Sequence, residues 1–107
     1  MKIESVKENV IFRRAYHKGR AVHTPIMSVY LLRNRVSKTR LGITVSKKIG
    51  CSPERNRIRR IIRAAFYQCA DLLPQNRDII VVARTAIKEL KSTDVENELR
   101  RHFEKNN

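Results

Sequence analysis

Residues 41–66 read LGITVSKKIGCSPERNRIRRIIRAAF, which predicts a strand, a loop and a long helix. The first part alternates apolar and polar residues, with Leu41, Ile43 and Val45 on one face of the predicted strand. The second part repeats apolar residues at intervals of three and four, the spacing of one helix face. The apolar positions of this helix are Ile58, Ile61, Ile62, Ala65, Phe66, Cys69, Leu72 and Leu73.

The flanks of this helix carry start and stop signals. Ser52 suits the N-cap and Pro53 suits the first turn, whereas Pro74 helps to end the helix. The continuous apolar run at residues 78–83 then predicts a central strand buried on both faces.

The chain before this unit begins with a predicted helix. Ser5 and Glu8 have the spacing of a capping box, and Gly19 follows as a stop signal. One apolar stripe lies between them, made of Ile11, Phe12, Ala15 and Tyr16.

Two further strands and a last helix complete the prediction. Residues 27–31 alternate as a strand, and a shorter strand is expected near residues 21–24. Thr93 and Glu96 have capping-box spacing, so the last helix is expected from about Thr93 to Phe103. The order α-β-β-β-α-β-α indicates an α+β two-layer sandwich, with helices packed on a four-stranded sheet.

Size and cysteine content agree with one ordinary domain. The 107 residues suit a single domain over 1–107, which buries enough surface to fold without a disulfide or a metal. Cys51 and Cys69 lie eighteen residues apart without a CxxC motif, which favours two free thiols in a reducing cytosol over a zinc site.

The net charge indicates a polyanionic partner. Twenty-four Lys and Arg against ten Asp and Glu give +14, a charge that opposes compaction of a small domain. Nucleic acid is the usual partner of such a domain. An anionic membrane surface is the other candidate, but the chain has no apolar run near the roughly 20 residues of a membrane span.

The basic residues concentrate around the long helix. On a helical wheel Asn56, Arg60 and Arg63 lie opposite the isoleucine stripe. The candidate contacts to nucleic acid are Lys47, Lys48, Arg55, Asn56, Arg57, Arg59, Arg60 and Arg63. Each pair of like-charged neighbours lowers the stability of a helix by roughly 0.2–0.5 kcal/mol, so a face with this many cations is not expected unless it binds an anionic partner. Arginine also binds phosphate through two parallel hydrogen bonds. Asn56 either orients a phosphate or a hydrated metal ion, or bonds to its own backbone.

Aromatic residues suggest a second surface. Phe12 and Tyr16 are one turn apart, and Tyr30 lies on the strand face opposite Val29, so together they would line a groove that stacks unpaired bases. The alternative is that Phe12 at least belongs to the core. No paired carboxylates, metal-ligand cluster or partnered histidine occurs in the sequence, so we expect no catalytic residue and no metal site on the protein.

Four segments together resemble the bacterial ribonuclease P protein component. They are residues 12–19 (FRRAYHKG), 41–50 (LGITVSKKIG), 55–66 (RNRIRRIIRAAF) and 78–84 (DIIVVAR). The likeness covers nearly the whole chain, and the strand-loop-helix motif is far more specific than an isolated Arg-Asn-Arg triplet.

The resemblance implies a left-handed βαβ crossover in the four-stranded sheet, an exception to the usual hand. It implies a cytoplasmic endoribonuclease that removes the 5′ leader of precursor tRNA, with catalysis by a large RNA subunit and its magnesium ions. The expected partners are ribonuclease P RNA and precursor tRNA, with no membrane and no protein partner. The helix from Arg55 to Arg63 would dock on the catalytic RNA, and the groove at Phe12, Tyr16 and Tyr30 would hold the leader.

Two points stay open at the level of sequence. A non-enzymatic RNA- or DNA-binding protein, such as a ribosomal protein, would also use a basic helix. In addition, residues 51–54 (CSPE) replace the small or aliphatic residues usual in the family, so Pro53 and Glu54 affect how Arg55 is presented.

Overall fold

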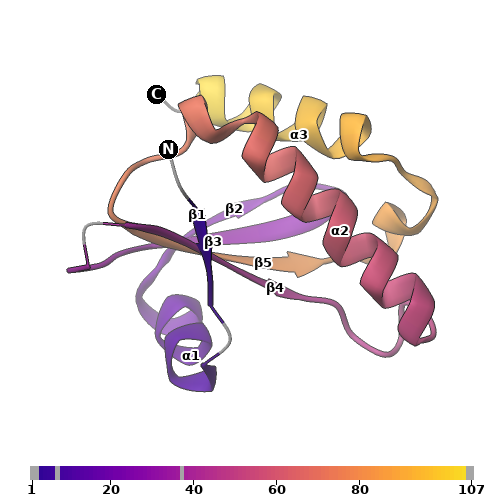
Figure 1. Cartoon of the computed structure of the whole chain (residues 1–107), viewed down its shortest axis with the longest axis horizontal. Coiled ribbons are helices and arrows are strands. Elements are labelled where there is room, and N and C mark those ends of the chain that lie inside the picture. Colours follow the sequence, from indigo (N-terminus) through magenta and orange to yellow (C-terminus); the bar gives the residue numbers. More distant parts are fainter. Residues whose placement is uncertain (1–2, 7, 37, 106–107) are drawn as a thin grey trace.

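The computed structural model describes residues 3–6, 8–36 and 38–105, which form one mixed sheet flanked by helices (Figure 1). The elements are β1 (Ile3–Ser5), α1 (Asn9–Lys18), β2 (Arg20–His23), β3 (Met27–Arg33), β4 (Thr39–Thr44), α2 (Ser52–Gln68), η1 (Ala70–Leu72), β5 (Arg77–Ala83), η2 (Thr85–Glu89) and α3 (Ser92–Lys105). Of these, η1 and η2 are short 3-10 helices that follow α2 and β5.

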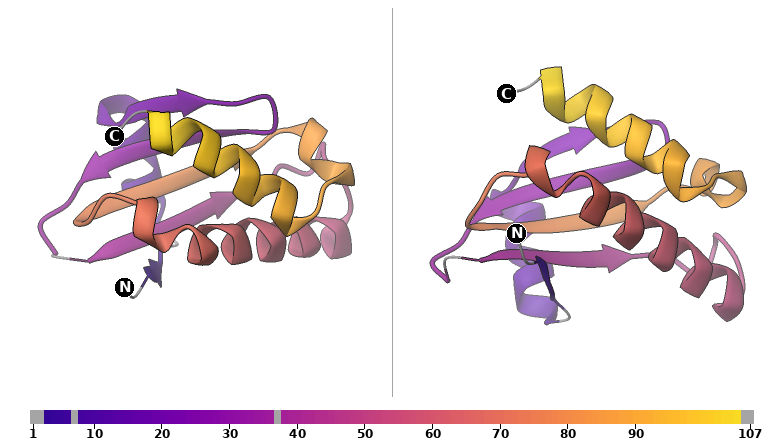
Figure 2. Two further views of the ribbon diagram at one scale, coloured as in Figure 1. Left: turned by 90° about the horizontal axis from the view of Figure 1, so that it is seen from above. Right: turned by 45° about the horizontal axis from the view of Figure 1, so that its top comes forward.

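The sheet has the order β1-β4-β5-β3-β2. β4 is parallel to both β1 and β5, whereas β3 is antiparallel to β5 and β2. In Figures 1 and 2, the chain leaves the end of β4, crosses over the sheet as α2 and returns to β5 with a left-handed sense. The α+β class and this crossover are as expected.

Helices cover both faces of the sheet. α2 and α3 pack on one face, where Ile58, Ile62 and Phe66 are fully buried. α1 packs on the opposite face, against Ile80 (Figure 1). The central strand β5 is buried on both faces, as its continuous apolar run predicts, because Ile79 and Ile80 point to opposite sides.

The fifth strand corrects the prediction for the N-terminal segment. Ser5 belongs to β1 and does not cap a helix, and the N-cap of α1 is Glu8, which makes no side-chain capping bond. The Ser5–Glu8 capping box was therefore wrong. This segment forms a strand because its backbone pairs with β4 and because Ile3 and Val6 are buried on doing so.

Helix ends also differ from the predicted bounds. α2 begins one residue earlier than expected, with Cys51 as its N-cap, and ends at Gln68 because the Cys69 N–H bonds to the carbonyls of both Ala65 and Phe66. The chain then tightens into the 3-10 helix η1.

The last helix starts at Ser92, so Thr93 lies inside it. The side-chain bond at its start comes from Asp94, whose Oδ2 accepts from the Lys91 N–H at 2.9 Å. The expected pairing of Thr93 with Glu96 was therefore two residues out of register. Among the described residues, no helix is long and apolar enough to cross a membrane.

Candidate nucleic-acid interface

The outer face of α2 is the first candidate surface. Asn56, Arg57 and Arg60 are exposed, whereas Ile58 and Ile62 are fully buried. The helical repeat therefore divides this helix into a packing face and a cationic face, as predicted.

Some cations of this face are already engaged with the protein. Arg57 donates to the carbonyl oxygens of Lys88 at 3.3 Å and Leu90 at 2.9 Å, which ties α2 to the end of η2. Arg59 donates to Oδ1 of Asn56 at 3.0 Å, so Asn56 holds an arginine side chain on its own helix.

The first turn of α2 shows how residues 51–54 are accommodated. Glu54 lies 3.4 Å from Lys88 Nζ and accepts from the Cys51 thiol at 3.5 Å. Hydrogen bonding to Lys88, and then to Cys51, lowers the pKa of Glu54 below its ordinary value. An acid in the first turn also suits the helix dipole. Arg55 donates to Ser52 Oγ at 3.0 Å, so its side chain folds back along the helix start.

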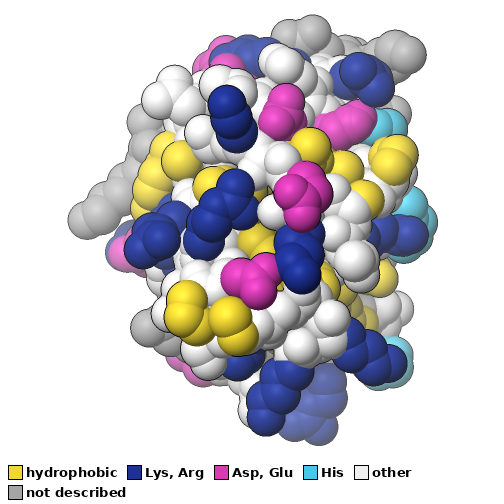
Figure 3. Space-filling model, turned by 90° about the vertical axis from the view of Figure 1, so that its right-hand side faces the viewer, with side chains coloured by type: hydrophobic (Ala, Val, Ile, Leu, Met, Phe, Trp, Pro, Cys, Tyr) yellow, Lys and Arg dark blue, Asp and Glu magenta, His cyan; other side chains and the backbone are white. Residues whose placement is uncertain are grey.

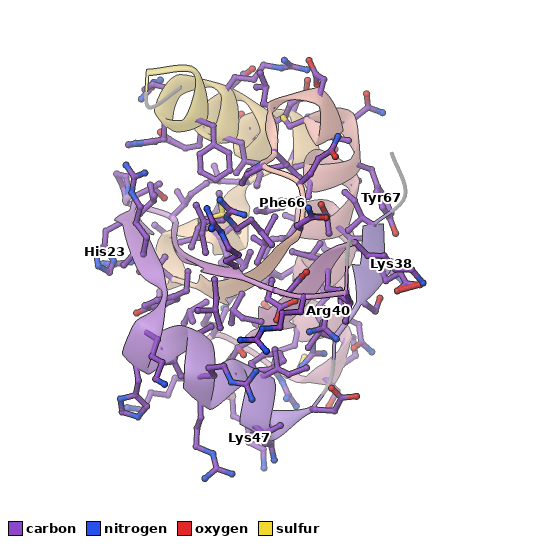
Figure 4. All side chains as sticks on the ribbon, turned by 90° about the vertical axis from the view of Figure 1, so that its left-hand side faces the viewer. His23, Lys38, Arg40, Lys47, Phe66 and Tyr67 are labelled. Atoms are coloured by element: carbon purple, nitrogen blue, oxygen red, sulfur yellow. The ribbon has the colours of Figure 1, made fainter. Side chains whose placement is uncertain are left out.

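Among the predicted nucleic-acid contacts, four cations make no hydrogen bond or ion pair with any described residue, and these are Lys47, Lys48, Arg60 and Arg63. Lys47 and Lys48 follow β4 in the turn that leads to α2, and Figure 4 shows Lys47 at the lower edge of the view. Figure 3 shows lysine and arginine side chains around the face where α2 begins, with a few acids near its centre. These side chains are free to bind phosphates.

The second candidate surface lies beside α1 on the opposite face of the sheet. The rings of Tyr16 and Tyr30 meet edge to face with centroids 5.1 Å apart, and the Tyr16 hydroxyl is 3.5 Å from Thr44 Oγ1. Phe12 lies one turn earlier, over Gly42, and packs partly into the core beneath α1. The structure thus brings the three aromatic residues to one surface, with Phe12 shared between surface and core.

A polar cluster continues this aromatic surface, and sequence reasoning missed it. His23 stands edge-on to Tyr30 with ring centroids 6.2 Å apart, and its Nδ1 is 2.9 Å from Ser28 Oγ. Arg84 donates to the same Ser28 oxygen at 2.9 Å. Ser28 and Tyr30 share a strand face by simple alternation, but His23 and Arg84 join them only through the pairing of three strands.

The most buried carboxylate serves the fold. Asp78 accepts from Arg40 at 2.7 and 2.9 Å and from Asn34 at 2.9 Å. The hydrogen bonds between Arg40 and Asp78 raise the pKa of Arg40. In the view of Figure 4, Arg40 lies near the centre, above α1, and its side chain is 22% exposed. Among the described residues, no three His, Cys, Asp or Glu side chains are placed to hold a metal ion together.

Comparison with known proteins agrees with this arrangement. The Ribonuclease P protein component of Clostridium acetobutylicum is 33% identical over 107 residues, covering 98% of this chain and 90% of that protein. That of Desulforapulum autotrophicum is 36% identical over 104 residues, covering 97% and 89%.

Solved structures show the same fold. The RNase P protein of Staphylococcus aureus superposes with a TM-score of 0.82 at 37% identity, covering 97% of this chain and 94% of that one. The protein from Thermotoga maritima has a TM-score of 0.83 at 23% identity, covering 95% and 96%, which supports the fold alone. A family model described as Ribonuclease P matches residues 1–107. The chain therefore belongs to the ribonuclease P protein family.

Proposed function

We propose that this chain is the protein subunit of a ribonuclease P ribonucleoprotein that removes the 5′ leader from precursor tRNA. The observation that carries the proposal is the presence of two chemically different surfaces on opposite faces of one sheet. One is the cationic face of α2, and the other is the aromatic surface of Tyr16 and Tyr30. A simple basic binder needs only the first.

The cationic face is suited to a folded RNA. Arg60 and Arg63 lie one turn apart and have no partner among the residues that the structure describes, so both guanidinium groups are available to phosphates. Lys47 and Lys48 extend this positive surface towards β4. Arg57 has a different role, because it joins α2 to the segment before α3.

The aromatic surface is suited to unpaired nucleotides. Tyr16 is 40% exposed, and its ring is held by both Tyr30 and Thr44. Stacking of a base on such a ring contributes roughly 1–3 kcal/mol and tolerates different sequences. A 5′ leader is single-stranded and varies in sequence, so this surface matches its chemistry.

We assign bond cleavage to the RNA subunit and its magnesium ions. Magnesium prefers oxygen ligands in octahedral geometry, which RNA phosphates supply. On this chain Asp78 already accepts three hydrogen bonds, from Arg40 and Asn34. The protein then contributes binding and orientation, and we place the complex in the cytoplasm.

Reconstitution tests the proposal directly. The protein is mixed with a bacterial ribonuclease P RNA and precursor tRNA at low magnesium, and correct 5′ cleavage is expected to increase. Replacing both Tyr16 and Tyr30 by Ala should reduce the preference for precursor over mature tRNA. The R60Q/R63Q protein should instead bind the catalytic RNA more weakly. R101Q, at an exposed position of α3, is the control for arginine loss and should change neither.

The non-enzymatic alternative makes a different prediction. A ribosomal or DNA-binding protein would bind duplex or ribosomal RNA through α2 and show no preference for a 5′ leader. Equal affinity for precursor and mature tRNA in the presence of the catalytic RNA, without a gain in cleavage, would favour that alternative.

A further inference from the structure

A hollow of about 410 Å³ lies between α2 and α1, at the edge of the sheet formed by β1 and β4. Its lining comes from all four of these elements. The volume falls in the range of roughly 300–1,000 Å³ that is typical of sites for small organic ligands.

The hollow contains a sheet edge that β1 leaves uncovered. β1 ends at Ser5, and the last bond to β4 runs from the Val6 N–H to the Leu41 carbonyl at 2.9 Å. Because successive residues of a strand direct their peptide groups to alternate sides, Ile43 directs its N–H and C=O to the same edge as Leu41. No described residue pairs with these two groups. The edge therefore offers one donor and one acceptor beside the hollow.

The same hollow has cations on one wall and apolar groups on another. Arg59 and Arg63 reach it from α2, and Arg63 has no partner among the described residues. Arg59 donates one N–H to Asn56 and retains its others. Phe12 and Val6 supply apolar surface from the α1 side.

We infer that this hollow binds one unpaired nucleotide of the RNA that docks on α2, an inference that rests on the proposed function. Arg59 and Arg63 bind its phosphate, and Phe12 contacts its base. The peptide group of Ile43 hydrogen-bonds to a donor and an adjacent acceptor on the edge of the base. The cations favour this occupant over an added peptide strand, which would use only the peptide edge. The catalytic RNA is the source, because the phosphate-binding wall belongs to α2.

Titration of the free protein with small probes tests the site itself. Adenosine 5′-monophosphate should shift the NMR signals of the Ile43 amide and the Arg63 Nε–H in a saturable way. Ribose 5-phosphate, which lacks the base, should affect Arg63 alone. The inference is overturned if Ile43 does not respond, or if ribose 5-phosphate acts as strongly as the nucleotide.

Ser5 provides a matched pair of variants, because it is exposed and lies on the rim of the hollow. S5F fills the hollow and should weaken nucleotide binding at least about tenfold, the scale of losing one stacked base. S5A keeps the hollow open and should bind as the wild type does. Should S5F fail to fold by circular dichroism, R63Q replaces it, with the same expected loss. Equal binding by the wild type and the filled or R63Q protein contradicts the inference.

The source of the nucleotide is tested in the complex. S5F should weaken binding to the catalytic RNA and leave the preference for precursor over mature tRNA unchanged. A loss of that preference alone would assign the hollow to the leader and overturn the stated source. Full cleavage enhancement and full RNA affinity with S5F would reject this inference while the proposed function stands. If the wild type does not enhance cleavage at all, the nucleotide titration still decides whether the hollow is a site.

Discussion

At the scale of single residues, Asp78 carries a larger part of the stability than any exposed charge. Its carboxylate is almost fully buried, and Arg40 and Asn34 satisfy it with three hydrogen bonds. D78A leaves Arg40 without its partner, so we expect the free energy of unfolding to fall by about 3 kcal/mol, at the low end for buried pairs because Arg40 is partly exposed. Urea unfolding measures the change. A loss comparable to that of an exposed ion pair would show that Arg40 finds a new partner in water.

Gly42 is needed because Phe12 occupies the space above it. A Cβ at this position would lie 2.6 Å from Phe12 Cζ and 2.9 Å from Ile80 Cδ1. G42A should therefore displace the Phe12 ring, lower stability by about 1–3 kcal/mol and weaken RNA binding at both surfaces that Phe12 lines. Urea unfolding and the affinities for precursor tRNA and for the catalytic RNA are the measurements.

The cause can be separated with a second substitution. F12L shortens the ring that meets the new methyl group, so G42A should cost less stability in F12L protein than in the wild type. If the losses of stability from G42A and F12L simply add in the double variant, then Ile80 or the strand backbone, and not Phe12, makes glycine necessary at position 42.

At the scale of the element, α2 combines two kinds of arginine. R57Q removes two bonds to the carbonyls of Lys88 and Leu90 and should destabilise the protein by about 0.5–1.5 kcal/mol. R60Q removes no contact with a described residue and relieves like-charge repulsion with Arg63, so stability should not fall. Affinity for the catalytic RNA should fall, and its salt dependence should weaken by about one unit of slope. Thermal unfolding and filter binding at several salt concentrations test the pair. Equal effects of R57Q and R60Q on stability would contradict this division of α2 into a structural arginine and an RNA-binding arginine.

The start of α2 should respond to acid. Bonding to Lys88 lowers the folded-state pKa of Glu54 below its ordinary value of 4.5. The contribution of this pair to folding stability is therefore present above pH 4.5, and it is lost as the pH falls through the lowered pKa. NMR titration of the Glu54 carboxyl group should give a pKa below 4.5 in the wild type. In K88Q the pKa should return towards 4.5, whereas K47Q, a lysine without a described partner, should leave it unchanged. A wild-type value at or above 4.5 would mean that the pair does not form in solution.

The elements also show what could be predicted from sequence. The two faces of α2 and the burial of β5 were predicted correctly, because hydrophobic spacing within one segment determines them. The three-residue strand β1 was missed, since only pairing with β4 makes it a strand. The cluster at His23 and Arg84 and the open edge at Ile43 were missed for the same reason. Each depends on neighbours that are distant in sequence.

At the scale of the whole molecule, the net charge of +14 should give opposite salt responses in folding and in RNA binding. The protein measures 35 × 29 × 22 Å, and the screening length falls from about 30 Å at 0.01 M salt to about 8 Å at 0.15 M. At low salt the cations therefore repel one another across most of the molecule. Adding salt should relieve this repulsion and raise the unfolding temperature.

The same addition of salt should weaken binding to the catalytic RNA. Phosphate contacts release counterions, so six to ten contacts predict a loss of roughly 10³–10⁵ in affinity between about 50 and 200 mM salt. R60Q/R63Q protein should show a smaller change in both measurements, whereas R101Q, whose charge is paired with Glu98, should resemble the wild type. An unfolding temperature that falls with salt would show that the ion pairs outweigh the repulsion. The cationic surface would then be stabilised within the free protein and would not depend on RNA to offset its charge.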